Sequence, residues 1–161
     1  MAALPFFSAD WAQAARTEIN EGPDPATVER KVEGFWNWIE RARANVNCTL
    51  GLAVRDLPDG SPDAIVLELE HGACTAVFLT TRAEAEPRCT YLLAGDLAAW
   101  RDVMDGYDMG RSIMYRKLLL EHGDVLVFFR TIYYWTETLA CLQRIPTAFP
   151  VVTADQLSRR A

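Results

Sequence analysis

The sequence predicts an α+β fold, in which a mainly antiparallel sheet is covered on one face by helices. Three observations predict it. Apolar residues recur with the helical period through the first 44 residues, period-two alternation begins at residue 46, and short strand and helix patterns then lead to one long final helix. The chain has 161 residues, of which 50% are hydrophobic and 24% charged. These values predict a single ordered domain over residues 1–161.

The first part of the chain is predicted to form two helices. Ser8 is a good N-cap for a helix that ends near Asn20, because its hydroxyl can accept a backbone N–H bond. Residues 21–25 (EGPDP) form a clear break. The second helix is expected over about residues 26–44. Its apolar residues share one core-facing stripe: Val28, Val32, Phe35, Trp36, Ile39 and Ala42. Trp38 lies off this stripe, so we expect it to be partly exposed or part of a contact surface.

Three strands are predicted to follow as a meander. Alternation over residues 46–54 indicates a strand with one buried face. Residues 56–62 have the composition of a surface hairpin loop. A second strand is expected over residues 65–70, with a tight return at residues 71–72. Residues 73–80 are apolar at successive positions, which favours a strand that is covered on both faces and lies centrally in the sheet.

Short elements alternate in the next part of the chain. A polar loop at residues 81–87 precedes a fourth strand at residues 88–93. Asp96 and Asp108 are each expected to cap a short helix, and Gly106 between them suits the end of the first helix.

The last part of the chain is predicted to hold one strand and one helix. Residues 118–121 form a plausible edge strand, and a turn at residues 122–124 leads into the final helix. That helix is expected to reach about Arg144, because Pro146 and Pro150 end regular structure.

Composition and charge exclude several partners. The net charge of −6 and the scattered basic residues argue against nucleic acid, which would require a basic stripe. No apolar run approaches the ~20 residues that cross a bilayer, so we expect no stable membrane insertion. The first ten residues do not resemble a secretory signal, and we expect a cytoplasmic protein. The four cysteines form no CxxC pair, which favours reduced structural thiols: Cys48, Cys74, Cys89 and Cys141.

The sequence offers little catalytic chemistry. Its two histidines each lie in a Glu-His-Gly triplet at a strand end, where turn residues are typical, so no metal and no cofactor are predicted. A Gly-x-Ser-x-Gly elbow and a glycine-rich phosphate loop are absent. Asp96, Asp105 and Asp124 fit helix caps and turns better than catalytic bases. We therefore expect a non-enzymatic protein; the alternative is an isomerase or cyclase with a carboxylate base and a tyrosine donor.

The order of elements in the second half carries a further signal. Its pieces are the strand at 88–93, the capped helix at 96–105 around Trp100, Gly106-Tyr107-Asp108, the helix at 109–115, Lys117-Leu118, Gly123-Asp124, the final helix and Ile145-Pro146-Thr147. Over residues 46–147 this order resembles the sterol carrier protein 2 family, with residues 1–45 as added helices and 148–161 as a tail. The resemblance implies a five-stranded sheet and a hydrophobic tunnel, between sheet and helices, that takes fatty acyl chains, sterols or other lipids.

One departure from the family concerns Arg116. This residue stands where the family's Gly-Lys-Leu has its glycine, and the span to Gly123-Asp124 is one residue longer. Loss of a glycine at a helix end removes easy access to positive φ. We therefore expect the mouth of a pocket here to be shaped differently.

Ten apolar residues are candidates to line such a pocket, because lipid pockets are built from aliphatic and aromatic side chains. They are Phe78, Trp100, Met104, Met109, Ile113, Met114, Phe128, Phe129, Ile132 and Tyr133. Three of the four methionines fall between residues 104 and 114, and flexible thioethers can pack around varied ligands. The alternative is that these residues fill an ordinary core.

The resulting functional prediction is non-enzymatic binding or transfer of a hydrophobic small molecule by a monomer or weak dimer. The alternative is an accessory subunit, with a protein partner, that docks on an enzyme acting on apolar substrates. Trp38 and the apolar segment 149–152 would supply its docking surface.

Overall fold

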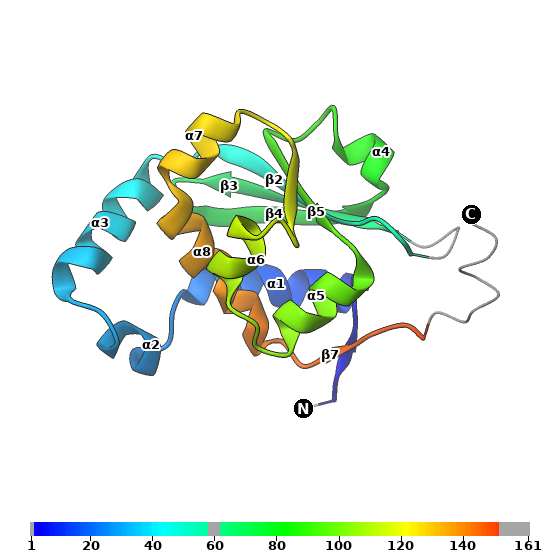
Figure 1. Ribbon diagram of the computed structural model, residues 1–161, viewed down its shortest axis with the longest axis horizontal. Helices are drawn as coiled ribbons and strands as arrows, with labels where there is room; N and C mark the ends of the chain where they lie inside the picture. The colour runs from blue at the N-terminus through cyan, green and yellow to red at the C-terminus, as the bar shows by residue number, and fades with distance from the viewer. Residues whose placement is uncertain (1, 58–61, 152–161) are drawn as a thin grey trace.

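The computed structural model describes residues 2–57 and 62–151, and it shows a five-stranded sheet with most of its helices on one side (Figure 1). The strand order is β4-β3-β2-β5-β6, and each neighbouring pair is antiparallel except β2 and β5, which are parallel. The strands are β2 Cys48–Val54, β3 Ala64–Glu70, β4 Ala73–Thr80, β5 Tyr91–Gly95 and β6 Leu119–His122. This architecture confirms the predicted α+β class with its mainly antiparallel sheet.

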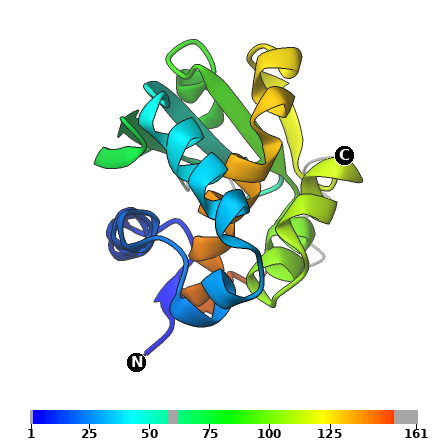
Figure 2. The same ribbon diagram turned by 90° about the vertical axis from the view of Figure 1, so that its left-hand side faces the viewer.

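Most of the helices pack on one face of the sheet and share a large apolar core with it. The helices are α1 Ala9–Glu21, α2 Pro25–Glu29, α3 Glu33–Ala44, α4 Arg82–Ala85, α5 Leu97–Met104, α6 Met109–Met114, α7 Val125–Arg130 and α8 Ile132–Ala140, which continues as the 3-10 turn η1 Cys141–Arg144. Buried residues of α1, α5, α6 and α8 pack against Leu50, Leu67 and Leu93 of the sheet. In the side view, α3 stands beside α8 at one end of this layer (Figure 2).

Local capping signals explain where several helices begin. The Ser8 hydroxyl accepts the backbone N–H of Trp11 at 3.2 Å, and the Asp108 carboxylate accepts that of Arg111 at 2.7 Å, both as predicted. Asp96 is the N-cap residue of α5, as predicted, but its side chain makes no capping bond. Asp56, two residues after the end of β2, accepts the N–H of Leu97 at 2.7 Å instead.

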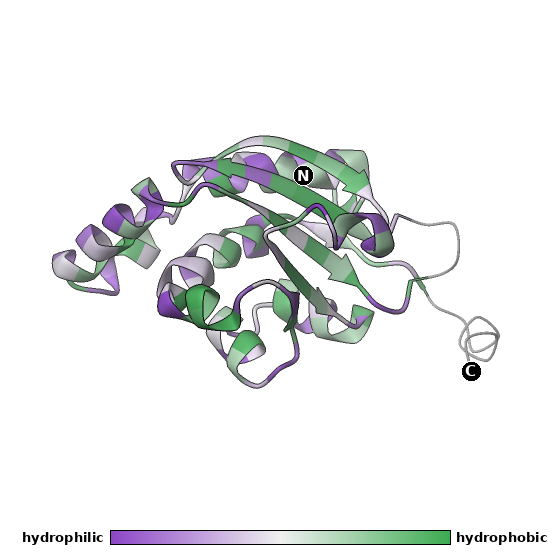
Figure 3. Cartoon of the chain, turned by 90° about the horizontal axis from the view of Figure 1, so that it is seen from above, coloured by the Kyte–Doolittle hydropathy of each residue, from purple (hydrophilic) through white to green (hydrophobic). Residues whose placement is uncertain are grey.

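A second, smaller core lies on the opposite face of the sheet, where the sequence predicted polar exposure. The prediction of a single buried face for β2 is wrong, because its last five residues are all buried. Its small residues, including Ala53, face Ala64 and Val66 of β3. The predicted polar loop at residues 81–87 contains the short helix α4, whose buried Ala85 covers this face. The strands are accordingly hydrophobic along most of their length (Figure 3).

The predicted central position of residues 73–80 is also wrong, because β4 is an edge strand. Its two faces are apolar for different reasons. Val77 and Leu79 pack against the main core, and Phe78 on the other face joins the smaller core, where the Arg88 guanidinium lies 5.0 Å from its ring centroid. A strand can therefore be covered by side chains on both of its faces although it pairs with a neighbouring strand along one edge only.

The predicted helix at residues 26–44 is broken into α2 and α3. Arg30, Lys31 and Val32 separate them, and Val32 is an extended N-cap residue with ψ 153°. Of the predicted stripe, Ile39 is buried, whereas Val28 and Val32 are exposed. The helix α3 thus contacts the core through Ile39, with Phe35, Trp36, Trp38 and Ala42 packed partly buried against it.

Two further boundaries differ from the prediction. The final helix is interrupted at Thr131, which has φ −115° and ψ 31°, so that α7 and α8 are separate helices. Regular structure also continues beyond Pro146, since β7 Thr147–Ala148 pairs in parallel with β1 Leu4–Pro5.

Arg116 adopts a left-handed backbone conformation just after the end of α6. Arg116 has φ 63°, the left-handed conformation that a glycine adopts without strain. Its N–H donates to the Ile113 carbonyl at 3.1 Å, and the N–H of Leu118 donates to the Ser112 carbonyl at 3.0 Å. The turn thus holds the arginine in a strained conformation, and the different shape expected for a pocket mouth here stays a prediction.

Candidate functional site

An open cleft of about 760 Å³ lies at one end of the sheet. Its lining residues come from α3, from α7 and the start of α8, and from the first residues of β2 and β5 with the residues just before them. Figure 2 shows how these helices are arranged beside the sheet. The lining residues are Trp38, Arg41, Ala42, Asn45, Val46, Asn47, Cys48, Thr90, Tyr91, Val127, Arg130, Thr131 and Trp135. Its volume falls in the range typical of small-molecule sites.

A packed aromatic cluster forms the inner end of the cleft. Trp135 stacks on Phe128 with their ring centroids 5.4 Å apart and their planes 10° apart. Tyr91 meets both rings edge to face, at 5.3 Å from Phe128 and 5.8 Å from Trp135. Phe128, Tyr91 and Trp135 are all buried, so this end of the cleft is a rigid apolar surface.

The wall formed by α3 is held by aromatic contacts to α8. Trp38 meets Tyr133 edge to face at 6.2 Å, and Phe35 meets the same ring at 6.2 Å. Lys31 forms an ion pair with Glu137 of α8 and lies 4.3 Å from the Phe35 ring centroid. These contacts place Trp38 at the rim, where the sequence predicted a partly exposed residue.

Some polar residues at the cleft form hydrogen bonds within the fold, whereas two arginines form no ion pair in the described part of the chain. Asn47 accepts the backbone N–H of His71 at 2.9 Å, and Thr90 accepts that of Thr49 at 3.2 Å, so both have structural tasks. Arg41 and Arg130 are exposed, and within residues 2–57 and 62–151 neither forms an ion pair. The mouth of the cleft therefore presents two guanidinium groups that are available to a ligand.

The lining of the cleft has few groups that could exchange a proton. None of the lining residues named above is a carboxylate or a histidine, and Tyr91 and Cys48 are the side chains among them that could act as an acid or base. Burial raises the pKa of the Cys48 thiol from 9.0 to about 11, with a smaller contribution from Cys89. The thiol is thus protonated at neutral pH and is a poor nucleophile.

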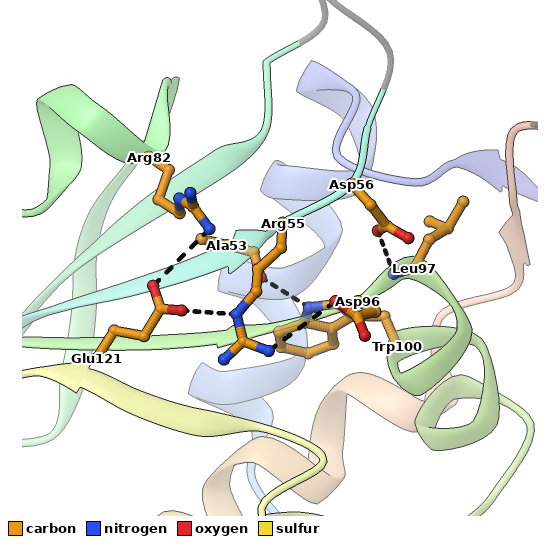
Figure 4. A network of polar contacts seen from close by, with 8 residues as sticks. All are labelled: Ala53, Arg55, Asp56, Arg82, Asp96, Leu97, Trp100 and Glu121. Carbon is orange, nitrogen blue, oxygen red and sulfur yellow. Dashed lines mark hydrogen bonds and ion pairs between the residues drawn. The ribbon is translucent and has the colours of Figure 1, made fainter. Parts of the chain in front are cut away.

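Charged and polar groups elsewhere have structural roles. At the opposite end of β2, Arg55 pairs with Glu121 at 2.6 Å and with Asp96 at 3.9 Å (Figure 4). Among the described residues, no three His, Cys, Asp or Glu side chains are placed to hold a metal ion. His71 lies in the β3–β4 turn as predicted, with its ring nitrogen 2.9 Å from the Ala44 carbonyl oxygen.

A second, more polar hollow of about 480 Å³ lies between α2 and α8. Several of its charged groups are already engaged, although Arg30 also lines it and forms no ion pair among the described residues. Lys31 contacts Glu137 there, and Arg144 donates to Glu18 at 2.6 Å and to the Gly22 carbonyl at 2.7 Å. This hollow is therefore a weaker candidate than the cleft.

The ten predicted pocket residues are distributed over the core and surface, and none lines the cleft. Phe128 lies directly behind it, stacked on Trp135, and Tyr133 supports Trp38 at its rim. The members that are buried in the main core are Trp100, Met109 and Ile113, and those that pack partly buried against it are Met104, Phe129 and Ile132. Phe78 lies on the other face of the sheet, and Met114 is 59% exposed. Their role in ligand binding stays a prediction.

The residues that do line the cleft were missed for a topological reason. They come from three segments, and those at residues 45–48 and 90–91 meet only because β2 and β5 are parallel neighbours. The available signal was Trp38, whose position off the apolar stripe indicated a surface of its own. Within the part of the chain that the structure describes, no helix is long and apolar enough to cross a membrane.

Comparison with known proteins relates the fold of this chain to that of solved structures. Neither a family model nor a curated protein matches the chain. The crystal structure of sterol carrier protein 2 matches with a TM-score of 0.65 at 25% identity, over 87% of this chain and 98% of that one. The solution structure of a conserved hypothetical protein from Thermus thermophilus, named with the suggestion of a sterol carrier protein, matches with a TM-score of 0.62 at 24% identity, over 94% and 96% respectively. The chain therefore has a sterol carrier protein 2-like fold.

Proposed function

We propose that this chain binds a hydrophobic small molecule, such as a fatty acyl chain, a sterol or a similar lipid, in the cleft between α3 and α7–α8. It carries or transfers this ligand without changing it chemically. The observation that carries the proposal is the cleft itself, with a volume of about 760 Å³, a buried aromatic inner surface and no carboxylate or histidine in its lining. The names of the two structural neighbours support the same class of ligand.

The expected affinity follows from the apolar area that such a ligand would bury. Each buried methylene contributes about 0.8 kcal/mol, so a chain of about 14 methylenes gains about 11 kcal/mol. Association costs at least about 4 kcal/mol of lost translational and rotational freedom. The remainder is at most about 7 kcal/mol, which corresponds to a dissociation constant of about 10 μM or weaker.

The two arginines suggest how the ligand would be oriented. Arg41 and Arg130 line the mouth, whereas Tyr91 and Trp135 line the inner end. An apolar body would therefore lie against the aromatic rings, and a polar or anionic end would remain near the guanidinium groups in solvent.

The accessory-subunit alternative has less support than the carrier. The two aromatic residues that suggested a docking surface both have partners within the fold: Trp38 lines the cleft, and the Phe149 ring packs against Phe6 with their centroids 4.8 Å apart. Val152, the last residue of the proposed docking segment, lies outside the described residues.

A fluorescent-probe titration tests the proposal. Fatty-acid and steroid probes are titrated into wild-type protein and into two variants, Ala42→Trp and Ala98→Trp. Ala42 lines the cleft, whereas Ala98 is exposed on α5 and lies outside its lining. We expect saturable binding near 1:1 that Ala42→Trp weakens at least about tenfold and Ala98→Trp leaves unchanged. Absence of saturable binding in the wild type, or an equal response of the two variants, would overturn the proposal.

A further inference from the structure

The first turn of α7 exposes three consecutive aliphatic side chains. Val125 is 52% exposed, Leu126 79% and Val127 43%. The same short helix is anchored by the fully buried Phe128, so it cannot rotate these residues inward without losing that contact. In the view from above, this exposed helix is strongly hydrophobic, whereas α3 beside it is of mixed character (Figure 3). Exposed aliphatic side chains grouped in this way are typical of an interaction site.

This apolar turn is continuous with the mouth of the cleft. Val127 belongs to both, and Arg130 one turn later also lines the cleft. Across the opening stand Trp38 and Arg41 of α3. The rim thus combines exposed aliphatic groups, an amphipathic aromatic side chain and two cations, the residue types that settle at the boundary between lipid headgroups and acyl chains.

The charged residues at this surface indicate which kind of partner would bind it. The chain has a net charge of −6, yet Arg41 and Arg130 form no ion pair among the described residues. Asp124, the acid that begins α7, is engaged as a cap and accepts the Val127 N–H at 3.1 Å. A second copy of the chain would bring the same cations together across a two-fold axis, where they repel. An anionic lipid surface attracts them instead.

We propose that α7 and the rim of the cleft dock reversibly on an anionic lipid bilayer. Val125, Leu126 and Val127 enter the headgroup region, and Arg41 and Arg130 contact lipid phosphates. The inference goes beyond ligand binding but rests on the cleft as the ligand site, because docking in this orientation turns the mouth of the cleft toward the bilayer. An apolar ligand can then enter the cleft without crossing bulk water.

Vesicle flotation tests the proposal with a matched pair of variants. Leu126→Asp places a charge in the apolar turn, and Val32→Asp makes the same change at an equally exposed valine (76%) at the far end of α3, outside the cleft. Vesicles are prepared from phosphatidylcholine with and without phosphatidylglycerol. We expect wild type and Val32→Asp to float with the phosphatidylglycerol vesicles, and Leu126→Asp to bind them at least about tenfold more weakly.

The double variant Arg41→Gln/Arg130→Gln tests the contribution of charge. Each arginine near an anionic surface strengthens binding about fivefold, so this variant should bind phosphatidylglycerol vesicles about 25-fold more weakly. Its weak binding to pure phosphatidylcholine should not change. Circular dichroism confirms that each variant is folded.

Three outcomes would overturn the docking proposal. The first is wild-type protein that fails to float with either kind of vesicle. The second is equal vesicle binding by Leu126→Asp and Val32→Asp. The third is a lipid-free dimer, seen by light scattering, that Leu126→Asp dissociates, which would make a second copy the occupant. Probe titration in solution is run on the same variants. Leu126 does not line the cleft, so a loss of flotation with intact probe binding concerns the docking surface, whereas absent probe binding in the wild type concerns the cleft.

Discussion

The indole nitrogen of Trp100 donates a hydrogen bond to the carbonyl oxygen of Ala53 at 2.8 Å, in a fully buried contact that ties α5 to the central strand β2 (Figure 4). The sequence placed Trp100 in a ligand pocket, whereas the structure gives it a core position. Trp38, which the sequence set apart from the core, lies at the cleft. We therefore expect Trp100 to contribute to stability and Trp38 to contribute to the proposed binding.

Trp100→Phe should reduce stability and leave binding intact. The change removes a buried hydrogen bond and leaves space in the core, which together cost about 2–3 kcal/mol. Urea unfolding measures the loss. Trp38→Phe should cost less than about 1 kcal/mol, because its ring is partly exposed, and should weaken probe binding instead. The reverse pattern, with Trp100→Phe impairing binding in folded protein, would place the ligand in the sequence-predicted pocket.

Arg116→Gly should stabilise the protein. Arg116 is held at φ 63°, where an L-residue loses about 1–2 kcal/mol relative to its favoured conformations. Glycine avoids this strain but adds about 0.5–1 kcal/mol of unfolded-state entropy, so we expect a net gain of about 0.5–1 kcal/mol. Arg111→Gly, at an exposed helical position, is the control and should destabilise by about 1 kcal/mol. Thermal unfolding that ranks the two variants the other way contradicts this assignment.

Arg144→Met should be much more damaging than the loss of a surface cation. Arg144 donates to the Glu18 carboxylate and to the carbonyls of Glu18 and Gly22, which joins η1 to the end of α1. Losing these partly buried, charge-assisted bonds costs about 2–3 kcal/mol. Lys117→Met removes the exposed ion pair to Asp102, at 3.2 Å, and should cost less than about 1 kcal/mol. Equal losses in urea unfolding would show that Arg144 does not hold the two segments together.

Stability should fall at alkaline pH because of the buried thiols. Burial raises the pKa of Cys48, Cys74 and Cys89 from 9.0 to about 11. The unfolded chain therefore releases these protons at a lower pH than the folded chain does. The contribution of the protonated thiols to the free energy of unfolding is complete below about pH 9 and is lost as the pH rises toward 11. Burial raises the pKa of Tyr134 in the same direction. The urea midpoint should drop between pH 9 and 11, and less steeply when the three cysteines are replaced by alanine. An unchanged slope would mean that the thiols titrate normally in the fold.

Much of the fold could be predicted because its signals are local. The hydroxyl of Ser8, the carboxylate of Asp108 and the positive φ of Gly106 (105°) act within one helical turn, and each marks a boundary that the structure contains. The period-two patterns likewise located β2 and β3, and the continuous apolar run at residues 73–80 located β4. Such features depend on neighbouring residues alone.

The remaining differences arise from packing between distant segments. The break at Thr131 carries no proline or glycine, and the burial of Ala53 depends on α4, which the sequence presented as a polar loop. The cleft depends on the same kind of information. Asn45 and Thr90 come together only through the parallel pairing of β2 with β5, which no local pattern encodes.

The cleft as the site of the hydrophobic ligand is tested most directly by thiol footprinting. Cys48 lines the cleft and Cys89 does not, yet burial raises the pKa of both thiols to about 11, so Cys89 is an internal control. Alkylation by iodoacetamide at mildly alkaline pH is followed by mass spectrometry, with and without a fatty-acid probe at about ten times its dissociation constant. We expect the probe to slow modification of Cys48 about tenfold, in proportion to occupancy, and to leave Cys89 unchanged. Saturable probe binding with no protection of Cys48, or with protection of Cys89 alone, would place the ligand elsewhere in the molecule.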